Sequence, residues 1–184
     1  HILSQYTSRL SHSPWKLRRN FSTPTMDGFG IAEKMQTSRR FRNICKCDHC
    51  NHQFVPDYYQ HVVIPGYGDK LETISKALLQ RIRWKEAALL CPRCGLKPDL
   101  SLPNREWVQE NLDDHHDAAG YYISPFDAPA IIRTSQLVKD STNYNRLTEF
   151  KNQALGLTAQ DSEETLVLED IKKSMVYSNL KDSG

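Results

Sequence analysis

Two short cysteine motifs constrain the fold of this chain more than any other feature. The first knuckle is Cys47-Asp48-His49-Cys50, and the second knuckle is Cys91-Pro92-Arg93-Cys94, which Gly95 follows. Two residues between cysteines let both thiolates reach one ion, while the intervening backbone amides stabilise their negative charge. Two such motifs supply the four ligands of a tetrahedral site. The sequence therefore predicts one structural zinc ion, held by Cys47, Cys50, Cys91 and Cys94.

The two knuckles lie far apart in the sequence. Residues 51–90 separate them, a longer span than the 15–20 residues of compact zinc ribbons. Apolar side chains recur at helical spacing in this span, at Leu71, Ile74, Leu78, Leu79 and Ile82. This spacing predicts an amphipathic helix over about residues 69–88. Something folded is therefore expected between the two halves of the metal site, with Phe41, Ile44 and Phe54 forming a small apolar layer beside it.

Other residues near the knuckles offer alternative interpretations. Cys45 stands too close to the first knuckle for standard ligand spacing, which favours a free thiol. His49 and His52 could replace a cysteine as ligands, but a role outside the coordination shell is the preferred interpretation. Two unrelated thiol pairs, or a redox protein that uses the second knuckle, would explain the same cysteines without zinc.

Composition limits the class of protein. The chain has 184 residues, enough for one or two domains, and its mean hydropathy of -0.62 implies a largely polar surface. The net charge of +2 is too small to predict nucleic-acid binding by itself. No apolar run approaches the roughly 18 residues of a membrane span. We therefore expect a soluble protein in a reducing compartment.

Hydrophobic periodicity and turn residues predict the other elements. Strands are expected at residues 18–21, 62–64 and 121–123, and helices at residues 31–37, 105–112, 132–139 and 145–155. Gly156 is expected to stop the last helix. Residues 113–117, Asp-Asp-His-His-Asp, resemble a metal cluster in composition, but adjacent side chains diverge, which favours a solvated loop.

Four segments, in order, resemble the middle of the large terminase subunit of tailed bacteriophages, the motor that drives DNA into the capsid. The segments are Arg9-Leu10 with Ser13-Pro14; Ser22-Thr23-Pro24-Thr25 with Gly28 and Gly30; Gly120 to Pro129; and Phe150 to Leu157, with Asp161 and Glu164. The second and third are the most specific, and the two knuckles lie between them.

This resemblance implies an α/β fragment with an inserted zinc ribbon and a helical C-terminal linker. Residues 1–38 would close an ATPase domain and carry its coupling motif, and residues 39–104 would form the zinc-ribbon insert. Residues 105–157 would be a lid or linker segment of the ATPase, and residues 158–184 would extend toward a nuclease domain. The full-length parent would be an ATPase and endonuclease of the host cytoplasm that assembles as a homo-oligomer with the portal protein and other terminase subunits.

The motifs of that chemistry are missing from this sequence. There is no phosphate-binding loop of the type G-x-x-x-x-G-K-[ST], no strand ending in paired acids for magnesium, and no set of carboxylates for a two-metal nuclease. ATP and magnesium would therefore bind only the full-length parent. The 184 residues alone are expected to be inactive.

Residues outside the knuckles have candidate roles as well, the first set from the resemblance and the second from its charge. The resemblance makes Ser22, Thr23, Pro24 and Thr25 the coupling motif, in which Ser22, Thr23 and Thr25 would sense the nucleotide; alternatively, the hydroxyls of these three residues merely cap the next helix. Two basic groups near the knuckles are candidates for contacting double-stranded DNA, with a solvated surface as the plainer interpretation; the residues are Arg39, Arg40 and Arg42, and Arg81, Arg83 and Lys85.

Aromatic residues have two possible roles. Trp84 could add stacking to the second basic group. Trp15, Trp107, Tyr121 and Tyr122 are expected in the core. A rival function, from another class, is a free-standing zinc-ribbon adaptor that binds nucleic acid or protein.

Overall fold

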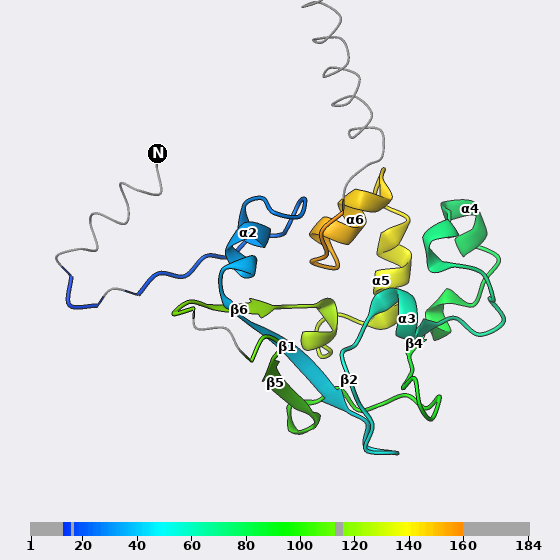
Figure 1. Ribbon diagram of the computed structural model, residues 1–184. Helices are drawn as coiled ribbons and strands as arrows, with labels where there is room; N and C mark the ends of the chain where they lie inside the picture. Colours follow the sequence, from blue (N-terminus) through cyan, green and yellow to red (C-terminus); the bar gives the residue numbers. More distant parts are fainter. Residues whose placement is uncertain (1–12, 16, 113–115, 160–184) are drawn as a thin grey trace, which may run out of the picture.

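The computed structural model describes residues 13–15, 17–112 and 116–159 (Figure 1). Helices and strands are short and mixed along the chain. In order, the α-helices and strands are α2 (Ile31–Gln36), β1 (Arg39–Lys46), β2 (Gln53–Phe54), α3 (Tyr58–His61), β3 (Val62–Val63), α4 (Lys76–Leu79), β4 (Ala88–Leu89), β5 (Arg105–Gln109), β6 (Ala119–Tyr122), α5 (Thr134–Ser141) and α6 (Leu147–Gln153). Short 3-10 turns are η1 (Leu71–Thr73), η2 (Trp84–Glu86), η3 (Leu102–Asn104) and η4 (Pro125–Asp127).

Strand β1 organises the larger sheet. It pairs antiparallel with β5 over Phe41–Cys45, antiparallel with β2 at Cys45 and Lys46, and parallel with β6 over Arg39–Arg42. The nearby strand β2 and two strands that are distant in sequence, β5 and β6, therefore meet on β1, which leads directly into the first knuckle. A second, two-stranded sheet pairs β3 with β4 and leads into the second knuckle.

The core lies between the sheets and the two C-terminal helices. Phe150 of α6, Val138 of α5, and Ile64 and Leu89 beside the second sheet are almost fully buried. The ring of Tyr58 in α3 meets Phe150 edge to face, with centroids 5.3 Å apart. Figure 1 shows α3, α5 and α6 gathered on one side of β1 and β2. The mixed α/β class predicted from the sequence is confirmed.

The predicted helix over residues 69–88 is wrong. This span contains η1, α4 and η2; extended residues Ile74 and Ser75 separate η1 from α4, and a turn that begins at Gln80 separates α4 from η2. Thr73 and Ile74 are β-branched and disfavour helix, and the Ser75 hydroxyl accepts the N–H of Leu78 to begin α4 afresh. Leu71 and Ile74 are still buried, so broken turns satisfy the apolar spacing that a continuous helix would have satisfied.

Two further predictions are corrected. Residues 105–112 contain strand β5 instead of a helix, because pairing with five residues of β1 satisfies the backbone of Arg105–Gln109. Residues 18–21 form no strand and are exposed. The remaining predicted elements are present with shifted ends, as α2, β3, β6, α5 and α6. Gly156 follows the last helix with a positive φ of 67°.

The pairing of β1 with β5 also joins residues on both sides of the boundary predicted at residue 104. One sheet therefore contains strands of the predicted zinc-ribbon insert and of the segment after it. Within the described residues, no helix combines the length and apolarity required to cross a membrane.

Candidate metal centre

The four predicted ligands converge. The sulfur atoms of Cys47, Cys50, Cys91 and Cys94 all lie within 4.8 Å of one another. Two pairs that link the knuckles, Cys47 to Cys94 and Cys50 to Cys91, have Sγ to Sγ distances of 3.7 Å. A tetrahedral ion with metal to sulfur bonds of about 2.3 Å requires sulfurs about 3.8 Å apart, whereas a disulfide requires about 2.05 Å. Two sulfur pairs therefore have the spacing expected around a tetrahedral ion, and all four sulfurs are close enough to share one ion.

The two knuckles share one backbone design. The N–H of Cys47 donates to the carbonyl of His52 (2.8 Å), and the N–H of Cys91 donates to the carbonyl of Leu96 (2.9 Å), five residues on in each case. Asn51 and Gly95 close the turns by donating to the carbonyls of the same two cysteines. Two equivalent turns therefore present their thiols to a common centre.

The residue after each knuckle has a left-handed backbone. Gly95 has φ of 69° and Asn51 has φ of 56°; among the described residues Asn51 is the single non-glycine with a positive φ. Glycine adopts this conformation without penalty, and asparagine tolerates it better than most residues. Asn51 thus provides the left-handed turn residue of the first knuckle, and Gly95 provides that of the second.

Burial makes this a closed site. Cys47 and Cys91 are 0% and 1% exposed, and Cys50 and Cys94 are half-buried. Four protein thiols leave no coordination position for water, which is the arrangement of a structural ion and not of a catalytic one.

Proton affinities differ within the cluster. Burial tends to raise the pKa of Cys91, but hydrogen bonds from the N–H groups of Cys94 and Arg93 lower it to about 7. The N–H of His52 tends to lower the pKa of Cys50, but burial and the neighbouring thiols raise it to about 12. The Cys91 thiol therefore loses its proton more readily than the Cys50 thiol. A second thiolate beside the first is unfavourable because the two negative charges repel unless a cation neutralises them.

The remaining cysteine and the nearby histidines lie outside the cluster. Cys45 is fully buried on β1, and burial raises the pKa of its thiol to about 11. The ring of His52 stacks near Phe54, and His49 Nε2 lies 3.1 Å from the carbonyl oxygen of Lys97. The arrangement is the one expected of a free thiol and of histidines outside the coordination shell.

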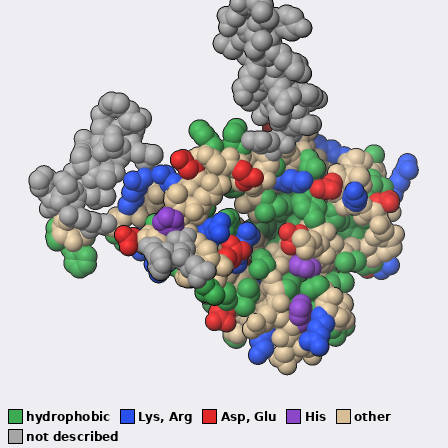
Figure 2. All heavy atoms as spheres, viewed as in Figure 1, with side chains coloured by type: hydrophobic (Ala, Val, Ile, Leu, Met, Phe, Trp, Pro, Cys, Tyr) green, Lys and Arg blue, Asp and Glu red, His purple; other side chains and the backbone are tan. Residues whose placement is uncertain are grey.

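Several predicted DNA contacts have partners within the protein. Arg42 pairs with Glu110 at 2.8 Å and lies over the ring of Tyr122, and Arg83 pairs with Glu86. Arg39 and Arg40 are half-buried. Arg81 and Lys85 are exposed. Figure 2 shows basic and acidic side chains interspersed over the visible face. DNA binding by these residues stays a prediction.

The expectation that four aromatic residues lie in the core is wrong for three of them. Trp15 is exposed, Trp107 is 39% exposed and Tyr121 is 50% exposed, while Tyr122 is half-buried under Arg42. Trp107 and Tyr121 form a pair of partly exposed rings on the sheet, with centroids 5.2 Å apart, because β5 and β6 both pair with β1.

The coupling segment is exposed and irregular. Ser22 Oγ donates to the neighbouring carbonyl of Thr23 (3.1 Å). Helix α2 begins after Gly30 with no side-chain cap, so the helix-capping alternative for these hydroxyls is wrong. The carbonyl of Thr25 accepts the N–H of Ala159 (3.1 Å), which links this segment to the chain beyond α6. Asp113, Asp114 and His115 of the predicted charged loop, and residues 160–184 of the predicted linker, lie outside the described residues.

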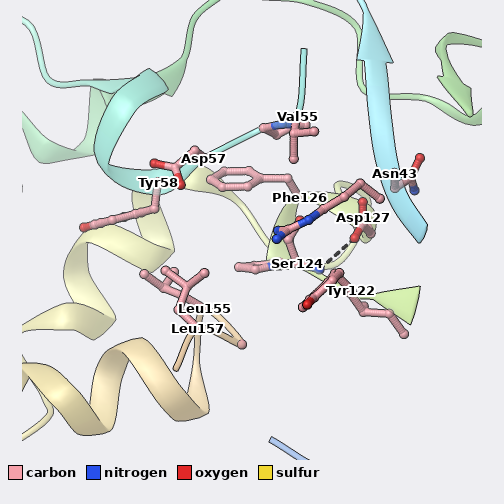
Figure 3. A pocket seen from close by; sticks show the side chains of 15 residues that line it. Asn43, Val55, Asp57, Tyr58, Tyr122, Ser124, Phe126, Asp127, Leu155 and Leu157 are labelled. Carbon is pink, nitrogen blue, oxygen red and sulfur yellow. Dashed lines mark hydrogen bonds between the residues drawn. The ribbon is translucent and has the colours of Figure 1, made fainter. Parts of the chain in front are cut away.

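Sequence reasoning missed a buried ion pair beside the sheet. Arg105 and Asp127 have side chains 4% and 10% exposed. Arg105 Nη1 also donates to the carbonyl of Phe126 (3.2 Å), and Asp127 Oδ2 accepts the N–H of Ser124 (2.7 Å). Figure 3 shows Ser124, Phe126 and Asp127 around a cavity of about 60 Å³, far smaller than the roughly 300 Å³ of small-molecule sites. We therefore interpret the Arg105–Asp127 pair and the residues around it as stabilising the fold and not as forming a small-molecule site. Arg105 lies opposite Cys45 in the strand pairing and reaches Asn43 Oδ1 at 3.3 Å, so no signal within its own short segment pointed to Asp127.

Comparison with known proteins identifies no relative: no family model, curated protein or solved structure matches this chain.

Proposed function

We propose that this chain is the central part of the large subunit of a viral DNA-packaging motor, with a structural zinc ion at the four-thiol site. The convergence of four sulfurs within 4.8 Å of one another, two pairs of them at 3.7 Å, supports the metal assignment. Tetrahedral sulfur sites are typical of zinc and of iron. Zinc is the proposed ion because it is redox-inactive and four-cysteine sites are a common form of structural zinc site.

The role in packaging rests on the four segments that resemble terminase, taken in order. Contacts in the fold support it. The third resembling segment begins in β6, which pairs with β1 on the way to the first knuckle. In the second segment, the carbonyl of Thr25 accepts the N–H of Ala159, which lies just after Leu157 of the fourth. Segments that a motor would need to couple therefore touch.

In the full-length protein, Ser22 to Thr25 would respond to the nucleotide, and the metal module would be a rigid surface for DNA, the portal or a neighbouring subunit. Rigidity follows from the site itself, since one ion fixes two turns that residues 51–90 separate. ATP and magnesium would bind residues upstream of this part.

The metal assignment is tested by elemental analysis of the purified chain. One zinc per chain is expected. A chain that carries iron, or no metal, would contradict the assignment.

The packaging role is tested by the sequence that flanks residues 1–184 in their reading frame, and by an assay of ATP hydrolysis. A phosphate-binding loop upstream supports the motor, whereas a start codon near His1 and a stop after Gly184 support the free-standing adaptor. ATP hydrolysis by residues 1–184 alone would contradict the proposal. The affinity for duplex DNA should fall steeply as the salt concentration rises if arginines and lysines contact phosphates. Arg81 and Lys85 are exposed, so they are the first residues to substitute.

A further inference from the structure

Two side chains of the first knuckle bond to the backbone that follows the second knuckle. Asp48 Oδ1 accepts the N–H of Asp99 at 3.0 Å. His49 Nε2 lies 3.1 Å from the carbonyl oxygen of Lys97 and donates to it. These bonds span 51 and 48 residues of sequence. They join the two halves of the metal site independently of the sulfurs.

The segment that receives these bonds is itself held in place. Asp99 Oδ1 accepts the N–H of Ser101 (3.0 Å), and its Oδ2 accepts the Ser101 hydroxyl (2.6 Å). Asn104 Nδ2 donates to the Asp99 carbonyl (3.2 Å). The next residue, Arg105, begins β5 and pairs with Cys45 of β1. Asp48 and His49 therefore bond to a turn that is anchored on the sheet carrying their own knuckle.

The second knuckle makes no equivalent bonds to the part of the chain that the structure describes. Its intervening residues are Pro92, which lacks an N–H, and Arg93, which is exposed. Within the described residues the Arg93 side chain makes no hydrogen bond or ion pair. The two knuckles thus share a backbone design, but one of them supplies the bonds between the halves.

We propose that Asp48 and His49 are positioning residues for the metal ion, a proposal that rests on the metal assignment above. Neither is a ligand. By fixing Lys97 and Asp99 beside the first knuckle, they hold the four sulfurs at ligand spacing before an ion arrives. Binding of an ion to such a preformed site costs little free energy for ordering the chain. The ion also dissociates slowly, because no sulfur can move away from it independently of the others. Loss of hydrogen bonds around metal ligands typically reduces metal affinity about 10-fold to 100-fold.

The test measures the rate at which the zinc-loaded full chain transfers Zn²⁺ to a chromophoric chelator in excess. Asp48→Ala and His49→Ala are expected to transfer Zn²⁺ about 10 to 100 times faster than the wild-type chain. Asp48→Asn is expected to stay near the wild-type rate, because the amide Oδ1 still accepts the Asp99 N–H. Arg93→Ala, the matched position of the second knuckle, is the control and should transfer at the wild-type rate.

The visible spectrum of the Co²⁺-loaded chains separates positioning from a change of ligands, since four thiolates around cobalt should give the same bands in every variant. If an alanine variant fails to fold, the Zn²⁺ transfer rate is measured in milder variants instead. These are His49→Gln, Asp48→Asn and the doubly substituted Asp48→Asn/His49→Leu. Equal transfer rates in all folded variants would overturn the positioning role alone. A wild-type chain that takes up neither Zn²⁺ nor Co²⁺ would refute the metal centre and this proposal with it.

Discussion

The Asp127→Ala substitution removes one partner of the buried ion pair and leaves the guanidinium of Arg105 behind. That side chain is 4% exposed, so water cannot replace the lost carboxylate. The carbonyl of Phe126 and Asn43 Oδ1, at 3.2 and 3.3 Å, remain as acceptors, but neither carries a charge. Breaking a buried pair in this way costs about 3–5 kcal/mol. The loss also includes the bond from the Ser124 N–H.

The assay is urea unfolding of the zinc-loaded chain, followed by tryptophan fluorescence. With a slope of about 2 kcal/mol per molar urea, the midpoint is expected to fall by about 1.5–2.5 M. Glu86→Gln is the control, because the Arg83–Glu86 pair is exposed and water screens it. Its midpoint should match that of the wild-type chain.

A second variant tests the cause of the loss. Replacing both charges with apolar residues, as in Arg105→Met/Asp127→Leu, removes the unpaired charge and should recover much of the stability. If Asp127→Ala unfolds at the same urea concentration as Glu86→Gln, the reasoning from burial is wrong. If the double variant is less stable than Asp127→Ala, an unpaired guanidinium is not the cause.

Three other predictions concern the metal, pH and packing. Cys91→Ser should lose the zinc and its stabilisation, whereas Cys45→Ser should retain one zinc per chain by elemental analysis. His61 Nδ1 accepts the Asp57 N–H (3.0 Å) and burial lowers its pKa from 6.5, so the neutral ring is the stabilising form; the free energy of unfolding should fall as pH drops below about 6.5, with a smaller fall in His61→Gln. A Cβ on Gly120 would clash with Ser38 Oγ and Met35 Sδ, so Gly120→Ala should cost about 1–3 kcal/mol in thermal unfolding.

Each of these has an outcome that would count against it. Retention of zinc by Cys91→Ser would mean that three thiols suffice. A pH profile identical in the wild-type and His61→Gln chains would place the acid sensitivity elsewhere, with the thiolates as the obvious source. Gly68→Ala is the packing control, since a Cβ there meets nothing within 4 Å; equal loss in both glycine variants would point to backbone entropy instead of a clash.

The four-cysteine cluster was predictable because its signal is local. Two residues between cysteines fix the turn, and the chemistry of the thiol limits what it binds, so Cys47, Cys50, Cys91 and Cys94 follow from spacing alone. Helices α5 and α6 were predictable for a similar reason, since their apolar residues and Gly156 lie within a few turns. The helix expected over residues 69–88 failed because apolar spacing does not report whether the backbone between Leu71 and Ile82 is continuous.

Strand β5 illustrates what sequence reasoning could not reach. Trp107 and Val108 lie in a short segment whose periodicity suits a helix or a strand, and the choice depends on Phe41–Cys45, more than sixty residues away in the sequence. The Arg105–Asp127 pair depends in turn on that strand. The partial exposure of Trp107 and Tyr121 follows as well, because the pairings of β5 and β6 with β1 decide which face of the sheet each ring lies on.

The sequence by itself determined that two turns would each offer a pair of thiols, since a knuckle depends only on residues within it. Only the tertiary structure decided how the turns face each other, and that Asp48 and His49 would bond to the backbone after the second. Such contacts join groups about fifty residues apart, and their geometry exists only once the sheet around β1 has formed.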